Sequence, residues 1–151
     1  MRSRLTAFVA ATLLASLGHA GVVDAADPET GDPETGQRLY GRHCAACHVI
    51  AAPDGTTLMR GGVSGPNLFG IVGRQAGAVD GFARYGADLV AAGEAGLVWD
   101  AGTLDAYLTD PRAVMRTVLD NPRAGSRMVF RLRAEADRRD VIAYLKTLRA
   151  D

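Results

Sequence analysis

The chain has 151 residues, a length that suits a single domain. Its 17 basic and 17 acidic residues cancel, so the bulk charge gives no argument for nucleic-acid binding. Hydrophobic residues make up 48% of the chain, enough for a globular core, but domains this short often depend on a metal, a disulfide or a cofactor.

The first 25 residues have the organisation of a secretory signal peptide. Arg2 and Arg4 form a basic start, and residues 5–17 carry no charge. An apolar run of that length is too short to span a bilayer comfortably, so cleavage is favoured over a retained anchor. We expect cleavage near Ala25, with Ala20 as the alternative. The mature protein is then expected in the periplasm, with no stable membrane span.

The mature chain is expected to begin with a flexible polar stretch over residues 26–33 and to fold over residues 34–151. Asp32 followed by Pro33 is typical of an N-cap and the first residue of a helix. This helix should run to about Cys44.

Residues 49–81 are rich in glycine, contain Pro53 and Pro66, and show no helical period. We expect a long loop with at most a short helical turn. Loops of this length are uncommon unless they serve a function or pack on a ligand. No segment of the chain has a convincing strand pattern.

The second half of the chain is expected to be helical. A short helix is predicted over residues 82–93, which Gly93 helps to end. Asp100 should cap another helix over about 101–109, because Pro111 stops it.

Two further helical segments are predicted, over residues 112–120 and 134–149, separated by a loop that opens at Asn121-Pro122. The last segment is the clearest, because its apolar residues recur on one face: Val141, Ile142, Leu145 and Leu148. The sequence therefore predicts an all-α, single-domain protein with four to five short helices.

Residues 44–48 read Cys-Ala-Ala-Cys-His, the C-x-x-C-H pattern typical of covalent haem attachment. Two thiols separated by two residues on a helical turn can both reach the vinyl groups of one haem. The histidine that follows is then held beside the iron, for which imidazole is a suitable ligand. Cys44 and Cys47 are thus the expected attachment residues and His48 the expected axial ligand.

Other uses of this cysteine pair fit less well. A thioredoxin-like dithiol needs a βαβ pattern, which the chain lacks. A structural zinc site needs four ligands, and the mature chain offers only two cysteines and two histidines bunched within residues 43–48. A disulfide would leave His48 unexplained.

The second axial ligand has to come from elsewhere in the chain. His43 lies on the same helical segment as His48 and is better interpreted as a surface residue. Three methionines follow the signal peptide, and methionine more often fills gaps in a core than binds iron. Met128 is the best candidate because it lies in a loop, whereas Met115 and Met59 are better interpreted as packing residues.

The chain is similar to soluble bacterial c-type cytochromes of the mitochondrial-like class, in their longer form. Five stretches carry the resemblance in the same order along the chain: 36–48, 65–77, 99–111, 125–130 and 140–145. Together they are far more specific than the C-x-x-C-H motif alone. The resemblance implies the cytochrome c fold around one covalently bound haem c.

The resemblance also implies the role of several residues around the haem. His48 and Met128 resemble the axial ligands, and the carbonyl of Pro66 resembles the acceptor of the ring N–H of the histidine.

Four further residues resemble those that line the haem pocket of the family. Arg74 and Trp99 resemble donors to a buried propionate, with Tyr85 as a possible helper. Tyr107 resembles the tyrosine that packs on the haem near the ligand methionine.

Two faces of the fold are implied in the same way. Gly36 and Tyr40 resemble the face that crosses the last helix near Val141 and Tyr144. The lysine-rich face of the family is replaced by arginines, which keep the positive charge but change its hydration and geometry: Arg112, Arg116, Arg123, Arg127, Arg131 and Arg133.

The function implied by this resemblance is that of a monomeric periplasmic carrier, which passes single electrons between larger redox proteins and is not an enzyme. Two protein ligands on the iron leave no open position for a substrate. An acidic docking surface is expected on the partner, opposite the arginines around Met128. A dedicated subunit of one redox enzyme complex is the main alternative, and a haem enzyme or sensor is a less favoured one.

Overall fold

The computed structural model describes residues 31–149, so the expected signal peptide and its cleavage site lie outside the described part of the chain. Its regular elements are α1 (Pro33–His43), β1 (Ile50–Ala51), β2 (Thr57–Met59), α2 (Ala87–Glu94), α3 (Ala101–Thr109), α4 (Pro111–Val118) and α5 (Glu135–Thr147). The expected all-α class is confirmed, with five helices among the described residues. None of the helices between residues 31 and 149 has the length and apolar character that a membrane span requires.

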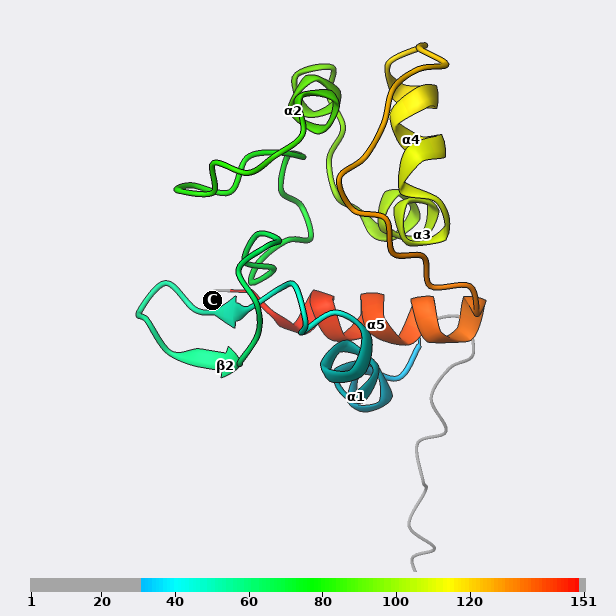
Figure 1. Ribbon diagram of the computed structural model, residues 1–151. Coiled ribbons are helices and arrows are strands. Elements are labelled where there is room, and N and C mark those ends of the chain that lie inside the picture. Colours follow the sequence, from blue (N-terminus) through cyan, green and yellow to red (C-terminus); the bar gives the residue numbers. More distant parts are fainter. Residues whose placement is uncertain (1–30, 150–151) are drawn as a thin grey trace, which may run out of the picture.

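Helices α1 and α5 cross at the base of the molecule, where Figure 1 shows α1 end-on against α5. The crossing depends on Gly36, since a Cβ atom at that position would collide with the backbone carbonyl of Asp140. One turn further on, the ring of Tyr40 packs edge-on against Tyr144, with 5.7 Å between ring centroids. The implied crossing of the first and last helices is therefore confirmed.

The predicted starts of α1 and α3 are confirmed by side-chain caps. The Asp32 carboxylate accepts hydrogen bonds from the first backbone N–H groups of α1, and Pro33 occupies the first turn. Asp100 caps α3 and forms a reciprocal capping box with Thr103. Each cap satisfies backbone donors that a helix cannot satisfy itself, which is why the sequence locates these ends well.

The expectation that the chain has no strand is wrong. β1 and β2 form a small antiparallel hairpin in which Ile50 pairs with Met59. Strands of two and three residues are too short to show the alternation that identifies a strand in a sequence. The hairpin turns through a glycine with a positive φ angle, Gly55.

The predicted helix over 82–93 is displaced, because α2 begins only at Ala87 and continues to Glu94. Residues before Gly86 instead pack their side chains, with the rings of Phe82 and Tyr85 at 4.8 Å. Gly93 lies inside the helix, where a Cβ atom would collide with the carbonyl of Ala76. Close packing, rather than helix termination, explains this glycine.

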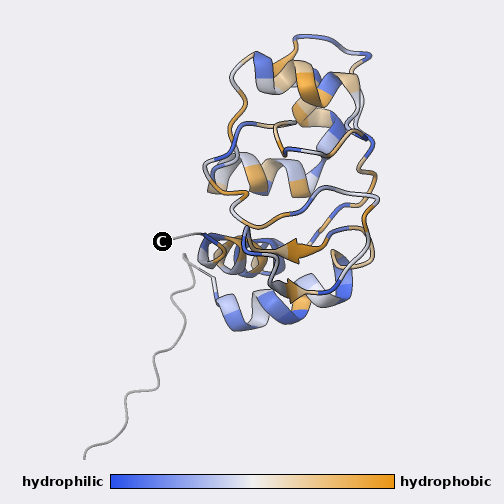
Figure 2. Ribbon diagram, turned by 90° about the vertical axis from the view of Figure 1, so that its left-hand side faces the viewer, coloured by the Kyte–Doolittle hydropathy of each residue, from blue (hydrophilic) through white to orange (hydrophobic). Residues whose placement is uncertain are grey.

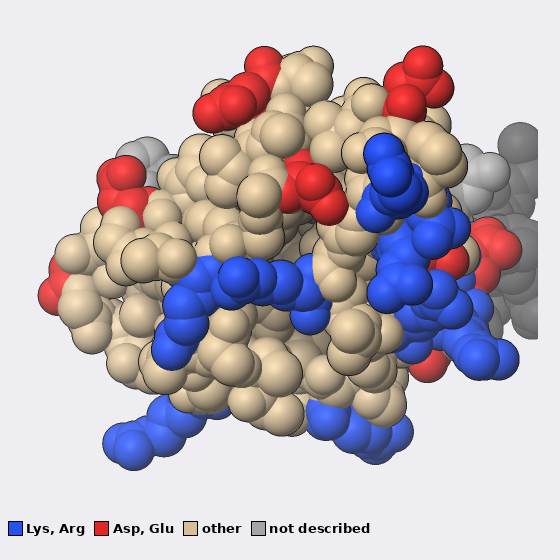
Figure 3. All heavy atoms as spheres, turned by 45° about the horizontal axis from the view of Figure 1, so that its top comes forward, with Lys and Arg blue, Asp and Glu red and all other residues tan. Residues whose placement is uncertain are grey.

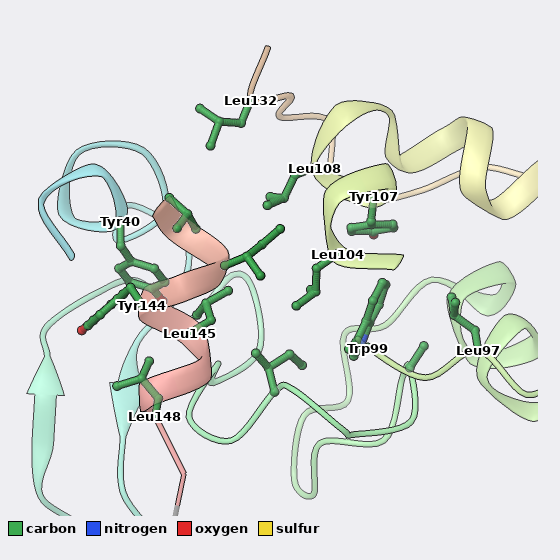
Figure 4. Close-up of a cluster of buried hydrophobic side chains, with 14 of the residues drawn as sticks. Tyr40, Leu97, Trp99, Leu104, Tyr107, Leu108, Leu132, Tyr144, Leu145 and Leu148 are labelled. Carbon is green, nitrogen blue, oxygen red and sulfur yellow. The ribbon is translucent and has the colours of Figure 1, made fainter. Parts of the chain in front are cut away.

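Apolar side chains from the helices and the loops form one core. Each helix in Figure 2 carries both hydrophilic and hydrophobic residues, as expected where one face is buried. Figure 4 shows Leu104 and Leu108 pointing from α3 toward α5, while Trp99 lies beside Tyr107. The predicted stripe on the last helix is buried in full: Val141, Ile142, Leu145 and Leu148.

Arg138 is the one charged residue that is buried among the described residues, with 8% of its surface exposed. Its guanidinium donates to the Asp105 carboxylate of α3 at 2.7 Å. It also donates to the carbonyls of Leu132 and Arg133, in the segment that leads into α5. Arg138 thus joins α3, α5 and that segment.

Replacing Arg138 with methionine is expected to lower the free energy of unfolding by about 2–3 kcal/mol, because it leaves buried carbonyls without a donor. Denaturant unfolding of the holoprotein measures this loss. Arg139→Met is the matched control, since its exposed i,i+4 pair with Glu135 contributes less than about 1 kcal/mol. Equal stability of the two variants would contradict this role of Arg138.

Candidate functional site

The C-x-x-C-H motif lies directly after α1 and continues it by one tight turn. The backbone N–H groups of Cys47 and His48 both donate to the carbonyl of Cys44, each at 3.0 Å. This turn contains both cysteines and ends at the histidine, and Cys44 and Cys47 form no disulfide with each other. Burial, followed by the nearby Cys47, raises the pKa of the Cys44 thiol to about 11.

The ring of His48 is held in one orientation. Its Nδ1 atom lies 2.8 Å from the carbonyl oxygen of Pro66, which can only accept, so Nδ1 carries the hydrogen and donates it. Burial lowers the pKa of His48, against the opposing effect of this bond, and so favours the neutral ring. Nε2 is therefore left as the nitrogen with a free lone pair.

The Gly-rich loop closes against this histidine. A Cβ atom on Gly65 would collide with the His48 ring, and one on Gly61 would collide with the His48 carbonyl. The hydroxyl of Tyr40 also donates to that carbonyl, at 3.2 Å. The loop therefore packs closely against the motif, which is possible because these positions are glycine.

These observations fit a covalent haem. Two cysteines close together in the chain, a half-buried neutral imidazole and a carbonyl that fixes its tautomer are the donor set that a haem c needs on one face. Cys44 and Cys47 would form the thioethers, and Nε2 of His48 would bind the iron. Bound haem would supply a one-electron couple, which none of the side chains provides.

Arg74 and Trp99 are brought together by backbone pairing. The Trp99 N–H donates to the carbonyl of Arg74 at 2.9 Å, and the Gly73 N–H donates to the carbonyl of Trp99 at 2.7 Å. The Arg74 guanidinium donates to the carbonyl of Phe69. Burial raises the pKa of Tyr85, against the opposing effects of the bond from the Val79 N–H and of the Arg74 charge.

Trp99 is buried between Arg74 and Tyr107 in the chain's core, with 5% of its surface exposed. Its ring packs edge-on against Tyr107 at 4.8 Å, as the close-up in Figure 4 shows. The propionate roles of Arg74, Trp99 and Tyr85 stay predictions that this proximity supports.

Tyr107 connects the pocket to the loop of Met128. Its hydroxyl lies 2.8 Å from the Ser126 hydroxyl, which in turn accepts the backbone N–H of Met128 at 3.1 Å. Burial raises the pKa of Tyr107, against the opposing bond from Ser126, so the hydroxyl stays neutral. Met128 itself is half-buried against the core. A short chain of hydrogen bonds therefore runs from α3 to the residue proposed as the second ligand.

The other two methionines occupy packing positions. Met115 is 0% exposed within α4 and belongs to the main core cluster. Met59 ends β2 and packs against the core next to Gly41 of α1. Both positions suit side chains that fill space.

Two features of the site were missed from the sequence. His43 is not an open surface residue: it is half-buried and its ring stacks on Phe130 at 5.9 Å. The Asp88 carboxylate of α2 accepts the backbone N–H of Gly125 at 2.7 Å. Both contacts join segments far apart in the chain, and no local pattern signals either of them.

Comparison with known proteins places these features in a family. The family model described as "Cytochrome c" matches residues 33–149. The chain is 48% identical over 144 residues to the cytochrome c-551 of Roseobacter denitrificans, covering 95% of this chain and 96% of that one. It is 36% identical over 143 residues to a cytochrome c2 of Cereibacter sphaeroides, covering 94% and 91%. The crystal structure of cytochrome c2 from Rhodobacter sphaeroides superposes with a TM-score of 0.75 at 39% identity, covering 78% of this chain and 96% of that one.

Proposed function

Because the chain belongs to the cytochrome c family, we propose that it is a periplasmic carrier that passes single electrons between larger redox proteins. One haem c is attached through Cys44 and Cys47. His48 and Met128 hold the two axial positions of its iron. This assignment leaves no open coordination position, which suits electron transfer better than catalysis.

The observation that carries this proposal is the fixed ring of His48. Its bond to the carbonyl of Pro66 at 2.8 Å sets the tautomer, and Cys44 and Cys47 lie in the turn that ends at His48. Such a carbonyl orients the imidazole and raises its basicity as an iron ligand. The thioredoxin-like use of the same cysteines gives no reason for this arrangement.

The alternatives make different demands on the site. A haem enzyme or sensor needs an axial position that opens easily, together with acid–base groups on that side of the haem. The hydrogen bonds from Tyr107 through Ser126 to Met128 instead hold that side closed. A dedicated subunit of one redox complex would use the same site, and differs from a free carrier only in its partner.

The surface around Met128 supports docking to an acidic partner. Val129 is 83% exposed directly after Met128, which offers an apolar contact at this point. Lys and Arg side chains gather beside a hollow on the face shown in Figure 3. Six arginines of α4 and the following segment are exposed: Arg112, Arg116, Arg123, Arg127, Arg131 and Arg133.

Two of these arginines are already engaged within the molecule. Arg131 pairs with Asp110 at 2.9 Å, and the guanidinium of Arg127 donates to the carbonyl of Arg84. Arg116 and Arg123 are exposed and are the better choice for a test of steering.

The rate of electron exchange with an acidic partner is expected to fall steeply as ionic strength rises, because salt shortens the range of the steering field. Arg116→Gln combined with Arg123→Gln should flatten that dependence and leave the reduction potential nearly unchanged. Stopped-flow measurement of the bimolecular rate over a salt series gives the slope.

The matched control removes the same net charge from other helices, as Arg38→Gln with Arg139→Gln. These arginines form i,i+4 pairs with Glu34 in α1 and Glu135 in α5. The control should keep the wild-type salt slope. A wild-type rate that does not respond to salt would remove this role from the arginines.

A further inference from the structure

The start of α2 lies along the loop that carries Met128. The Asp88 carboxylate accepts the N–H of Gly125 at 2.7 Å across a sequence separation of 37 residues. The Arg127 guanidinium donates to the carbonyl of Arg84 at 3.2 Å, so the two segments make contact twice. The side chain of Arg127 also passes close to Gly86.

We propose that Asp88 is a positioning residue that keeps Met128 on the iron, an inference that rests on Met128 as the axial ligand proposed above. Asp88 acts through Gly125, three residues before Met128, and does not touch the ligand itself. It determines how easily the loop moves away and an external ligand takes the sixth position.

The loop that carries Met128 connects α4 to α5, and its two sides are held in different ways. After Met128, the Leu132 N–H donates to the carbonyl of Leu108 at 2.9 Å, and Arg131 pairs with Asp110. Before Met128, the long-range hydrogen bond of a backbone N–H is the one from Gly125 to Asp88. Among the hydrogen bonds of residues 31–149, Asp88 is the only charged side chain that accepts from a backbone N–H in the loop before Met128.

The bond from Gly125 to Asp88 should resist opening of the loop. Hydrogen bonds with an ionised partner are roughly twice as strong as neutral ones. When Met128 leaves the iron, the residues before it have to shift, and this bond must stretch or break. Without Asp88 the loop keeps, just before Met128, the bond from Arg127 to the carbonyl of Arg84 and the neutral link from Ser126 to Tyr107.

Asp88 could instead serve only its own helix, because acidic residues in a first turn favour the helix dipole. The geometry points to the loop. α2 has Gly86 at its N-cap and no side-chain cap, and the Asp88 carboxylate is directed at Gly125. The two roles can be separated by moving the acid by one residue, to the exposed position of Ala87.

The test is imidazole binding to the ferric holoprotein, followed through loss of the absorption band of the iron–thioether bond. Asp88→Ala should bind imidazole roughly tenfold more tightly than wild type, the effect of losing one charge-assisted bond. Ala87→Glu with Asp88→Ala restores an acid in the first turn without the bond to Gly125, and should stay as tight as Asp88→Ala. Asp88→Asn, which keeps the shape and an oxygen acceptor, should change in the same direction by less.

The role of Asp88 would be overturned if Asp88→Ala bound imidazole with wild-type affinity. It would also be overturned if Ala87→Glu combined with Asp88→Ala regained that affinity. If Asp88→Ala does not fold, unchanged affinity in Asp88→Asn overturns it equally. Met128→Ala is the reference for an open iron. If the wild-type protein binds imidazole as tightly as Met128→Ala does, Met128 is not the axial ligand. This result differs from one that removes only the positioning role of Asp88.

Discussion

Replacing both Cys44 and Cys47 with serine is expected to leave the mature chain largely unfolded. The segment between β2 and α2 has little regular structure, and its glycines pack against the haem-binding turn: Gly61, Gly62 and Gly65. A cofactor that fills the centre of so short a chain contributes directly to folding, as structural metals do in other small domains.

Far-UV circular dichroism of the purified mature chain measures this effect, with wild-type holoprotein as the reference. Cys47→Ser alone is the matched control, since one thioether can still form at Cys44 and the helices should survive with a lower Tm. Native helix content in the double variant would show that the polypeptide folds without its haem, against this account.

Met128→Ala is expected to open the sixth coordination position and to lower the reduction potential. Thioether ligation favours ferrous iron, so the potential falls when the sulfur is lost. The change should be on the order of 0.2 V, a part of the roughly 0.8 V that axial ligation spans. The band of the iron–thioether bond should disappear from the ferric spectrum at the same time.

Potentiometric titration followed by absorbance measures the shift, and Met59→Ala is the matched control. Met59 is half-buried next to α1, and its loss should leave both the spectrum and the potential nearly as in wild type. A wild-type spectrum and potential in Met128→Ala would exclude Met128 as the ligand. Met115, a buried residue of α4, would then be the candidate for the second axial ligand.

The parts of the molecule that sequence reasoning located are those with local causes. Caps at Asp32 and Asp100 identify two helix starts because each side chain bonds to the N–H groups next to it. The C-x-x-C-H motif locates the attachment turn because all of its residues are neighbours in the chain. The crossing at Gly36 was expected only through family resemblance, because the collision with Asp140 that explains it is not local.

The features that sequence reasoning missed depend on contacts between distant segments. The hairpin of β1 and β2 is too short to have a period of its own. The stacking of His43 on Phe130 joins α1 to the segment that follows Met128, and nothing beside either residue predicts it. The bond from Gly125 to Asp88 is of the same kind. Such contacts follow from the assembled fold, and the site is held in place largely by them.

The central claim is that His48 and Met128 close both axial positions of one covalent haem in an electron carrier. Absorption spectra of the purified holoprotein, ferric and ferrous, with and without carbon monoxide, test it most directly. The account predicts low-spin spectra in both states, a ferric iron–thioether band and a ferrous spectrum that carbon monoxide leaves unchanged. A ferrous protein that binds carbon monoxide readily would contradict it and favour a haem enzyme or sensor.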